Sequence, residues 1–570
     1  MKNLMIYFSS LFFILSTLVA CTPSASLSEL DPYKRKSLNL NFKDLGKELP
    51  LNIYFLEDST GSEARDVIVY LKNKAWKRVG QEDDLSILRD LINRKFIVIT
   101  VDFGNDPEAT SPFIDHDLTR LFNAVFGYET TSLLDDIHLE PKTYRCFMLP
   151  EGYQIATDLV FWEIDKHAVH GTLEHVMKLY NTEIVPNVPG MKPAVKPSEM
   201  VDKQGNPFNY EIKMDIIYPS EAKKKLPTFI YSETQVRRTS RKRISDDGSK
   251  MPFFQLRGYV YILMGHCFSP TVTHYWHHAG FTLDHWNGFA CYTAGMRYIY
   301  ANAEKYNIDT DHIGMMGISK GQYAVTRLSD PNHAGGEESK KFEGYPEGTP
   351  EPQPWQGYPS KIHAGWQGMG MGLWESEYIT PDYVPTILAC GENDRDVITQ
   401  EGTPNFLRRL EQLDVNHIFL PMEGLGHSLS YGYDKKLGVD RYQLVIDFFD
   451  RYLKTEDKLP PAILMVTPRD SAEHVNPSSE ISVHFAPVMD KESVLENQAI
   501  RVIALKDNSN VPGTWSVSHG GTKFTFVPEH PLTSGEKFQV SITTHVKNED
   551  GIPLADEKTI KFQVVGIPEK

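Results

Sequence analysis

Three side chains of the types that act together in nucleophilic catalysis follow short apolar stretches of the chain. Ser319 stands between two glycines, each two residues away, directly after the apolar stretch 313–316. A serine hydroxyl becomes a strong nucleophile when a histidine takes its proton and a carboxylate holds that histidine in place. Asp394 and His427 occur downstream, each shortly after another apolar stretch. The order serine, aspartate, histidine predicts a triad with Ser319 as nucleophile, Asp394 as orienting acid and His427 as general base.

The elements that would position these residues are strands of one parallel sheet. Strands are expected at 313–316, 384–390 and 418–421, and a helix rich in small residues is expected after Gly321. Glycines around the serine permit a tight strand-to-helix turn, and active sites of such sheets lie beyond the carboxyl ends of the strands. The run Gly-Ile-Ser-Lys-Gly resembles the nucleophile elbow of the α/β-hydrolases, whose triad residues occur in this same order.

The resemblance implies two further positions and leaves one alternative open. Asp396 is the rival for the orienting acid, although Asp394 has the expected spacing to Val397. In this fold the residue after the nucleophile, here Lys320, donates one backbone N–H to the oxyanion. The second donor should come from the loop after the strand that ends at Tyr231. Glu233 is our choice there, although the His-Gly-Gly run of many esterases is missing from this loop.

The composition describes an ordinary globular protein with an acidic surface. The chain has 570 residues, 41% hydrophobic and 24% charged, with a net charge of −16. Such a negative charge argues against a nucleic-acid partner. Histidines cluster at 274–285 without the spacing of a known metal site, so neither a metal nor a cofactor is expected. Trp276 and Trp286 in the same stretch could stack on a sugar ring.

Residues 1–21 have the features of an export signal. A basic start is followed by an apolar stretch, 4–18, that is shorter than most transmembrane helices, and then by Leu-Val-Ala-Cys. This tetrapeptide resembles the lipobox of bacterial lipoproteins, which implies lipidation of Cys21. We therefore expect a lipid-anchored protein of the bacterial cell envelope. An ordinary signal peptide and a signal anchor are the alternatives.

Residues 22–200 predict an N-terminal α/β accessory region. Strands are expected at 51–56, 67–71 and 96–101, with a helix at 84–94 between the last two, which is the pattern of a βαβ unit. The unit could be a second α/β half that packs on the catalytic sheet, or it could add edge strands to that sheet. The proline-rich stretch 185–197 is typical of a linker, and residues 201–457 form the predicted catalytic domain.

The last hundred residues predict an all-β domain at 461–570. Short alternating strands recur with turns between them, which is typical of a β-sandwich. The runs 467–471, 483–490 and 526–532 resemble the bacterial Ig-like domain of the S-layer type. That resemblance implies a spacer or interaction module. The fold class is thus an α/β-hydrolase with a mostly parallel sheet flanked by helices, an N-terminal α/β region and a C-terminal Ig-like sandwich.

The main functional hypothesis is an extracytoplasmic serine hydrolase that cleaves carbohydrate-linked carboxylic esters. A serine peptidase of the prolyl-oligopeptidase type would have the same triad order, but the early residues show no propeller repeats. A binding lipoprotein on a hydrolase scaffold would not need all three triad residues. The expected partners are therefore an ester substrate and a membrane, reached through the lipid anchor.

Overall fold

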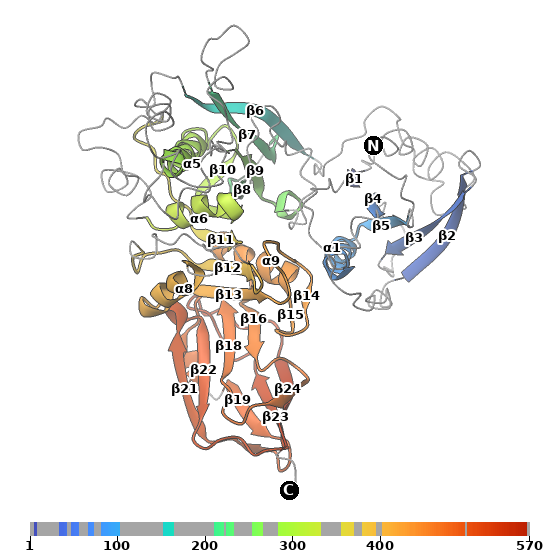
Figure 1. The fold of residues 1–570 in the computed structure, drawn as a ribbon, viewed down its shortest axis with the longest axis vertical. Helices are drawn as coiled ribbons and strands as arrows, with labels where there is room; N and C mark the ends of the chain where they lie inside the picture. The colour runs from blue at the N-terminus through green and yellow to red at the C-terminus, as the bar shows by residue number, and fades with distance from the viewer. Residues whose placement is uncertain are drawn as a thin grey trace, which may run out of the picture.

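The structure is a computed structural model with three folded parts (Figure 1). It describes residues 5–7, 34–42, 47–55, 67–72, 81–102, 152–164, 210–221, 224–232, 254–265, 283–331, 355–369, 379–394, 402–495 and 499–566. The sequence also favours a helix at 167–180, which lies outside these residues, as does the predicted linker at 185–197.

The central part is built on an eight-stranded sheet in the order β13-β12-β11-β10-β8-β9-β7-β6. Counted from β6, this is the order 1-2-4-3-5-6-7-8, and only β7 runs against the others. That order and the single antiparallel strand define the α/β-hydrolase sheet. Its strands are β6 Tyr153–Ile164, β7 Tyr210–Pro219, β8 Leu226–Ser232, β9 Val260–Met264, β10 Ile308–Ile318, β11 Ala364–Gly368, β12 Thr386–Gly391 and β13 His417–Met422.

Apolar side chains alternate between the two faces of this sheet, as a two-residue period requires. On β10, Met315 packs in the cluster with helices α5 and α6, whereas Met316 packs in the cluster with helix α9. Burial on both faces explains why the inner strands are continuously apolar. The helices of this part are α5 Leu283–Ala301, α6 Gln322–Leu328, α8 Thr403–Gln412 and α9 Arg441–Leu453.

The sheet begins earlier in the chain than the sequence predicted. Strand β6 pairs with β7 along its whole length, from Tyr153↔Pro219 to Ile164↔Tyr210. The boundary at residue 201 therefore separates β6 from the sheet to which it belongs. The proline-rich stretch after β6 suggested a domain break, but the two strands on either side of it form one antiparallel pair.

The described strands of the N-terminal part, β1 to β5, form a separate five-stranded sheet, and none of them adds an edge to the catalytic one. Its order is β1-β4-β5-β3-β2, and β4 and β5 are parallel neighbours joined through helix α1, as the predicted βαβ unit requires. The elements are β1 Met5–Tyr7, β2 Lys34–Phe42, β3 Lys47–Phe55, β4 Val67–Lys72, α1 Gln81–Asn93 and β5 Ile97–Asp102.

Strand β1 falls inside the predicted signal segment. Removal of residues 1–20 would leave β4 as the edge of this sheet, because β1 pairs with β4 alone. Among the helices that the structure describes, none combines the length and the apolar character needed to cross a bilayer.

Helix α1 attaches the N-terminal part to the catalytic domain. Its apolar face, which includes Leu91 and Ile92, belongs to the same buried cluster as α9. Polar contacts surround this face. The Ser86 hydroxyl donates to Asp440 over 2.8 Å, and Asp90 accepts from the Tyr442 hydroxyl over 3.3 Å and pairs with Arg257. The accessory unit is therefore packed against the last helix of the catalytic domain.

The C-terminal part is a sandwich of two sheets, in the orders β16-β18-β22-β21 and β17-β24-β23-β19-β20. Phenylalanines from both sheets, including Phe485 and Phe538, meet in one core. The elements are β16 Ala462–Thr467, β17 Ala472–Val475, β18 Ile481–Ala486, α10 Lys491–Leu495, β19 Ile500–Ala504, β20 Ser509–Asn510, β21 Gly513–Ser518, β22 Lys523–Pro528, β23 Lys537–Ile542 and β24 Lys558–Val564.

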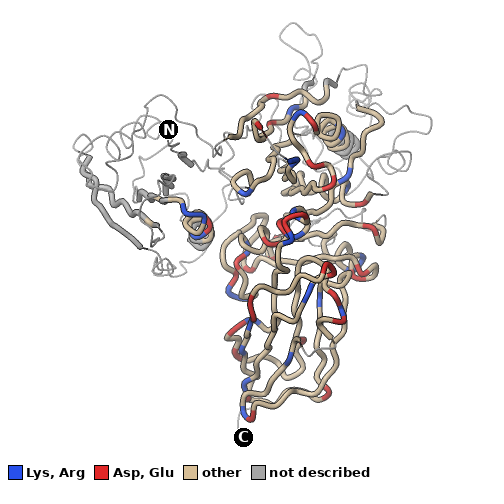
Figure 2. Tube along the Cα trace, turned by 180° about the vertical axis from the view of Figure 1, so that it is seen from behind, with Lys and Arg blue, Asp and Glu red and all other residues tan. Residues whose placement is uncertain are grey.

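The sandwich lies against the catalytic domain at the end of the sheet formed by β12 and β13 (Figure 1). Leu464 and Ala486 belong to the buried cluster of α9, so this contact includes apolar packing. Basic and acidic residues are interspersed over the sandwich and over the neighbouring end of the catalytic domain (Figure 2).

Candidate active site

The serine turn has the geometry that the glycine spacing predicts. Strand β10 ends at Ile318, Ser319 opens a short 3-10 turn, η6 Ser319–Gly321, and α6 follows at once. Ser319 has a φ of 54°, a left-handed conformation that is uncommon for a residue with a side chain. The energetic cost of that conformation is tolerated where surrounding structure imposes it, and such residues cluster at active sites.

Gly317 is required by a close approach of the backbone to itself. A Cβ at this position would lie 2.0 Å from the carbonyl oxygen of Gly321. No real contact is that short, and the oxygen belongs to the turn itself. Only glycine therefore allows β10 to enter the turn that exposes Ser319.

The structure brings the three predicted catalytic side chains into one hydrogen-bonded chain. Ser319 Oγ lies 3.0 Å from His427 Nε2, and His427 Nδ1 lies 2.8 Å from Asp394 Oδ2. The carboxylate can only accept from the ring, so Nδ1 carries the proton and Nε2 is free to accept one from the serine. The Asp394 side chain is 1% exposed and that of His427 is 39% exposed, so a buried acid supports a base that solvent and substrate can reach.

Backbone hydrogen bonds hold the acid loop against the base loop. The Glu392 N–H donates to the Met422 carbonyl over 3.0 Å, and the Asn393 N–H donates to the Leu425 carbonyl over 2.8 Å. A Cβ on Gly391 would lie 2.1 Å from the carbonyl oxygen of Gly426, so glycine is needed for this approach. The ends of β12 and β13 are thus fastened together, which fixes Asp394 relative to His427.

A buried polar network behind the nucleophile helix was not anticipated from the sequence. Gln367, which is fully buried on β11, accepts from the Thr326 hydroxyl of α6 over 2.8 Å. Its amide donates to the Tyr383 hydroxyl over 2.8 Å and to the Thr386 hydroxyl over 3.2 Å. This network ties α6 to β11 and β12. The one signal in the sequence was a glutamine inside a strand that is otherwise apolar.

The remaining predicted positions are described only in part. Lys320 follows Ser319 in η6, as the first oxyanion donor should. In the sheet Ser232 pairs with Gly317, so β8 ends beside the elbow. Glu233, the predicted second donor, is the next residue and lies outside the described residues, as do the rival acid Asp396 and the lipidation candidate Cys21.

Cys390, at the end of β12, is a free and buried thiol. Burial raises its pKa to about 11, and the nearby Asp394 carboxylate adds to the rise. The thiol therefore stays protonated near neutral pH, so it is a poor nucleophile there.

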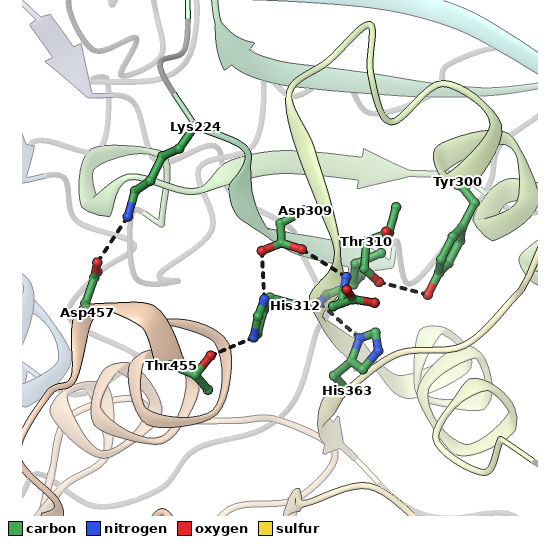
Figure 3. A network of polar contacts seen from close by, with 10 residues as sticks. Lys224, Tyr300, Asp309, Thr310, His312, His363, Thr455 and Asp457 are labelled. Atoms are coloured by element: carbon green, nitrogen blue, oxygen red, sulfur yellow. Dashed lines mark hydrogen bonds and ion pairs between the residues drawn. The ribbon is translucent and has the colours of Figure 1, made fainter. Parts of the chain in front are cut away.

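A second chain of carboxylate, histidine and hydroxyl lies where β10 begins (Figure 3). Asp309 Oδ2 is 2.7 Å from His312 Nδ1, and His312 Nε2 is 2.7 Å from Thr455 Oγ1. Thr455 opens the turn η9 Thr455–Asp457 after α9, and Lys224 pairs with Asp457 over 3.2 Å. We interpret these contacts as a structural tie between β10 and the end of the last helix.

This tie is well separated from the elbow. Ser319 follows His312 by seven residue steps along the strand, which corresponds to about 23 Å at the usual rise per residue. The two sets of side chains therefore lie at opposite ends of β10.

Comparison with known protein families identifies the C-terminal domain. Residues 457–564 match the bacterial Ig-like domain family. The chain matches none of the curated proteins with which it was compared. The fold is that of an α/β-hydrolase, by strand order and by the elbow, followed by a bacterial Ig-like domain.

Several solved structures are similar to this chain at low identity. An α/β-hydrolase, MGS-M1, from a Medee basin deep-sea metagenome library is 13% identical over 43% of this chain and 93% of its own, with a TM-score of 0.28. A truncated carbohydrate esterase from gut microbiota is 14% identical over 46% and 96%, with a TM-score of 0.29. The esterase Est2 of Thermogutta terrifontis is 16% identical over 49% and 100%, with a TM-score of 0.31.

Proposed function

We propose that the protein is a serine hydrolase that cleaves carboxylic esters. The observation that carries the proposal is the hydrogen-bonded chain from Ser319 through His427 to Asp394. Each of the three residues follows the carboxyl end of a different parallel strand, where this fold presents its catalytic groups. A binding protein on the same scaffold would have no need of this alignment.

The first half of the reaction forms an acyl-enzyme. Ser319 Oγ attacks the carbonyl carbon of the ester while its proton passes to His427 Nε2. Asp394 stabilises the imidazolium that results, because its buried carboxylate already accepts from Nδ1. The carbonyl oxygen becomes an oxyanion. The backbone N–H of Lys320, the residue after the nucleophile, stabilises this charge. The C–O bond then breaks, and the leaving alcohol takes the proton from His427.

The second half releases the acid. Water attacks the acyl carbon and gives a proton to His427 Nε2, and the tetrahedral intermediate collapses with return of that proton to Ser319. Electrons and protons balance within the triad, so the residues of the chain suffice for hydrolysis. The 39% exposure of the His427 side chain is consistent with access for water at this stage.

For the substrate we propose esters linked to carbohydrate, and for the location the bacterial cell envelope. Trp276 and Trp286 occur shortly before and within α5 in the sequence, and tryptophan rings stack well on sugars. Lipidation of Cys21 would anchor the protein, and the Ig-like domain would act as a spacer or interaction module. Mass spectrometry of the mature N-terminus tests the anchor: a cleaved, diacylated Cys21 is expected, and an unmodified Cys21 would refute it.

A substrate panel tests the reaction. We expect hydrolysis of acetylated, feruloylated or methyl-uronate saccharides by the wild-type chain and its loss in Ser319→Ala. Peptide cleavage in place of ester cleavage would favour a peptidase. If neither class is turned over and p-nitrophenyl acetate is hydrolysed equally by wild type and Ser319→Ala, the proposal fails.

A further inference from the structure

Three histidines from two domains meet where the Ig-like sandwich contacts the catalytic sheet. His417 begins β13, His484 lies in β18, and His519 opens the turn η10 His519–Gly521. The rings of His417 and His519 are stacked, with centroids 4.1 Å apart and planes 19° apart. His484 meets His519 edge to face at 5.2 Å. We call these three side chains the histidine clasp.

Hydrogen bonds place one proton on each ring of the clasp. His519 Nδ1 lies 2.9 Å from the His417 carbonyl, and His417 Nδ1 lies 2.8 Å from the Val415 carbonyl. A carbonyl only accepts, so both Nδ1 atoms are protonated. His484 Nε2 is 3.2 Å from Thr522 Oγ1, and that hydroxyl reaches Asn416 Oδ1 over 3.1 Å. Two of these contacts, His519 to the His417 carbonyl and Thr522 to Asn416, join the sandwich to the catalytic domain directly.

The clasp disfavours charge on its rings. His417 and His484 are 2% and 3% exposed. Burial lowers the pKa of His417, lowers that of His484 well below its usual value, and lowers that of His519 to about 4. A second proton on both His417 and His519 would put like charges on stacked rings.

Charged side chains around the clasp only partly offset the effect of burial on the pKa values of the three rings. Lys523 on β22 opposes a positive charge on all three rings, although it is itself paired with Glu480 over 2.8 Å. Asp414 favours a charge on His417 and His519, and Glu411 of α8 favours one on His417. Burial is the first cause at every ring, so the neutral state prevails.

We infer that the histidine clasp is an acid-sensitive latch, which holds the Ig-like domain against the catalytic domain at neutral pH and weakens as the medium becomes acidic. Elsewhere in the domain contact, Leu464 and Ala486 pack against the cluster of α9, and neither of these two side chains can gain a charge in acid. Acid would therefore loosen one side of the junction and leave the other, so that the sandwich gains freedom to tilt.

The size of the effect follows from His519 alone. Its pKa would return from about 4 to the ordinary 6.5 when the sandwich lifts away and the ring is hydrated. The neutral ring stabilises docking above pH 6.5, and that contribution is lost as pH falls from 6.5 towards 4. At pH 5 the undocking equilibrium constant should be about 30-fold larger than at pH 7.5. His417 and His484 act in the same direction.

Calorimetry and small-angle scattering of the full chain test the latch. Docked domains unfold together, so we expect the unfolding transitions of the two domains to separate, and the maximum dimension to grow, between pH 7.5 and pH 5. His519→Gln should reduce both changes relative to the wild type, because the amide can still donate to the His417 carbonyl but takes no charge. His417→Gln is a second variant, should the first fold poorly.

His474→Gln is the matched control, because His474 is exposed on β17 of the same sandwich. This variant should respond to pH as the wild type does. Transitions and dimensions that do not change with pH in the wild type would overturn the inference. An equal pH response in wild type, His519→Gln and His417→Gln would overturn it as well. Neither readout depends on ester hydrolysis, so failure here is distinct from failure of the proposed function.

Discussion

Replacement of Asp394 by asparagine isolates the contribution of the buried carboxylate to catalysis. The substitution keeps the size of the side chain but removes its charge and offers an N–H where an acceptor stood. His427 would then carry its proton on Nε2 in order to accept at Nδ1, so it could no longer take the proton of Ser319. The same substitution lowers kcat by about 10⁴ in another Ser-His-Asp enzyme.

The charge contribution can be worked from the geometry. Asp394 Oδ2 lies 2.8 Å from His427 Nδ1, which at an effective dielectric constant of 20 corresponds to about 6 kcal/mol between a carboxylate and an imidazolium. Because the His427 side chain is 39% exposed, water screens part of this attraction, and we take about 4 kcal/mol for the transition state. At about 1.4 kcal/mol per factor of ten, the loss is about a thousandfold.

The assay is kcat/KM for p-nitrophenyl acetate at pH 7.5, with circular dichroism to verify the fold. Glu392→Gln is the matched control, because Glu392 lies two residues away on the same loop and its pair with Lys436 is a surface ion pair at 2.9 Å. The contact of Glu392 with β13 is made by its backbone N–H, which the substitution leaves in place. The kcat/KM of the control should therefore stay within about threefold of wild type. Activity of Asp394→Asn above a tenth of wild type would refute the reasoning.

Three further predictions address the positions that build the site. Gly317→Ala should lower kcat/KM by about 100-fold or more, because a Cβ 2.0 Å from the Gly321 carbonyl forces the elbow to shift, and near-normal kinetics would contradict that reading. Gln367→Leu should lower the free energy of unfolding, measured by urea denaturation, by about 1–3 kcal/mol for each hydrogen-bond partner left unsatisfied. In Gln367→Glu the carboxylate can only accept, so the contact with Tyr383 is retained only when the tyrosine hydroxyl donates to it. Cys390 should resist iodoacetamide at pH 8 in the folded protein and react after denaturation, since burial holds its pKa near 11, and rapid modification of the native thiol would show that the end of β12 is open.

The sequence was most informative where a local rule determines a local structure. The glycines around Ser319 predicted the elbow, and at Gly317 no other residue permits the close approach of the backbone to the Gly321 carbonyl. The helical spacing of apolar residues at 439–454 predicts a helix, which appears as α9, Arg441–Leu453. Asp440 precedes its first residue, and the Asp440 side chain accepts from the Gln443 N–H. Triad order placed Ser319, Asp394 and His427 close together because strands of a parallel sheet end at one edge.

What the sequence missed depends on contacts between distant segments. Strand β6 belongs to the catalytic sheet because it pairs with β7, although residues 165–209 separate the two strands in the sequence. The residues of neither strand identify the other as its partner. The Gln367 network and the histidine clasp likewise join positions that are far apart in the chain. Such pairings follow from the assembled fold, so periodicity and spacing alone do not reveal them.

The most direct test of the account is covalent labelling of the nucleophile. After reaction with a fluorophosphonate, peptide mass spectrometry of the full chain should find one adduct, on Ser319, and labelling should be lost in Ser319→Ala and strongly slowed in His427→Ala. The exposed hydroxyl of Thr455, which also contacts a histidine, provides an internal comparison and should remain unlabelled. An unlabelled Ser319 in the folded wild-type protein, or equal labelling in Ser319→Ala, would contradict the central claim.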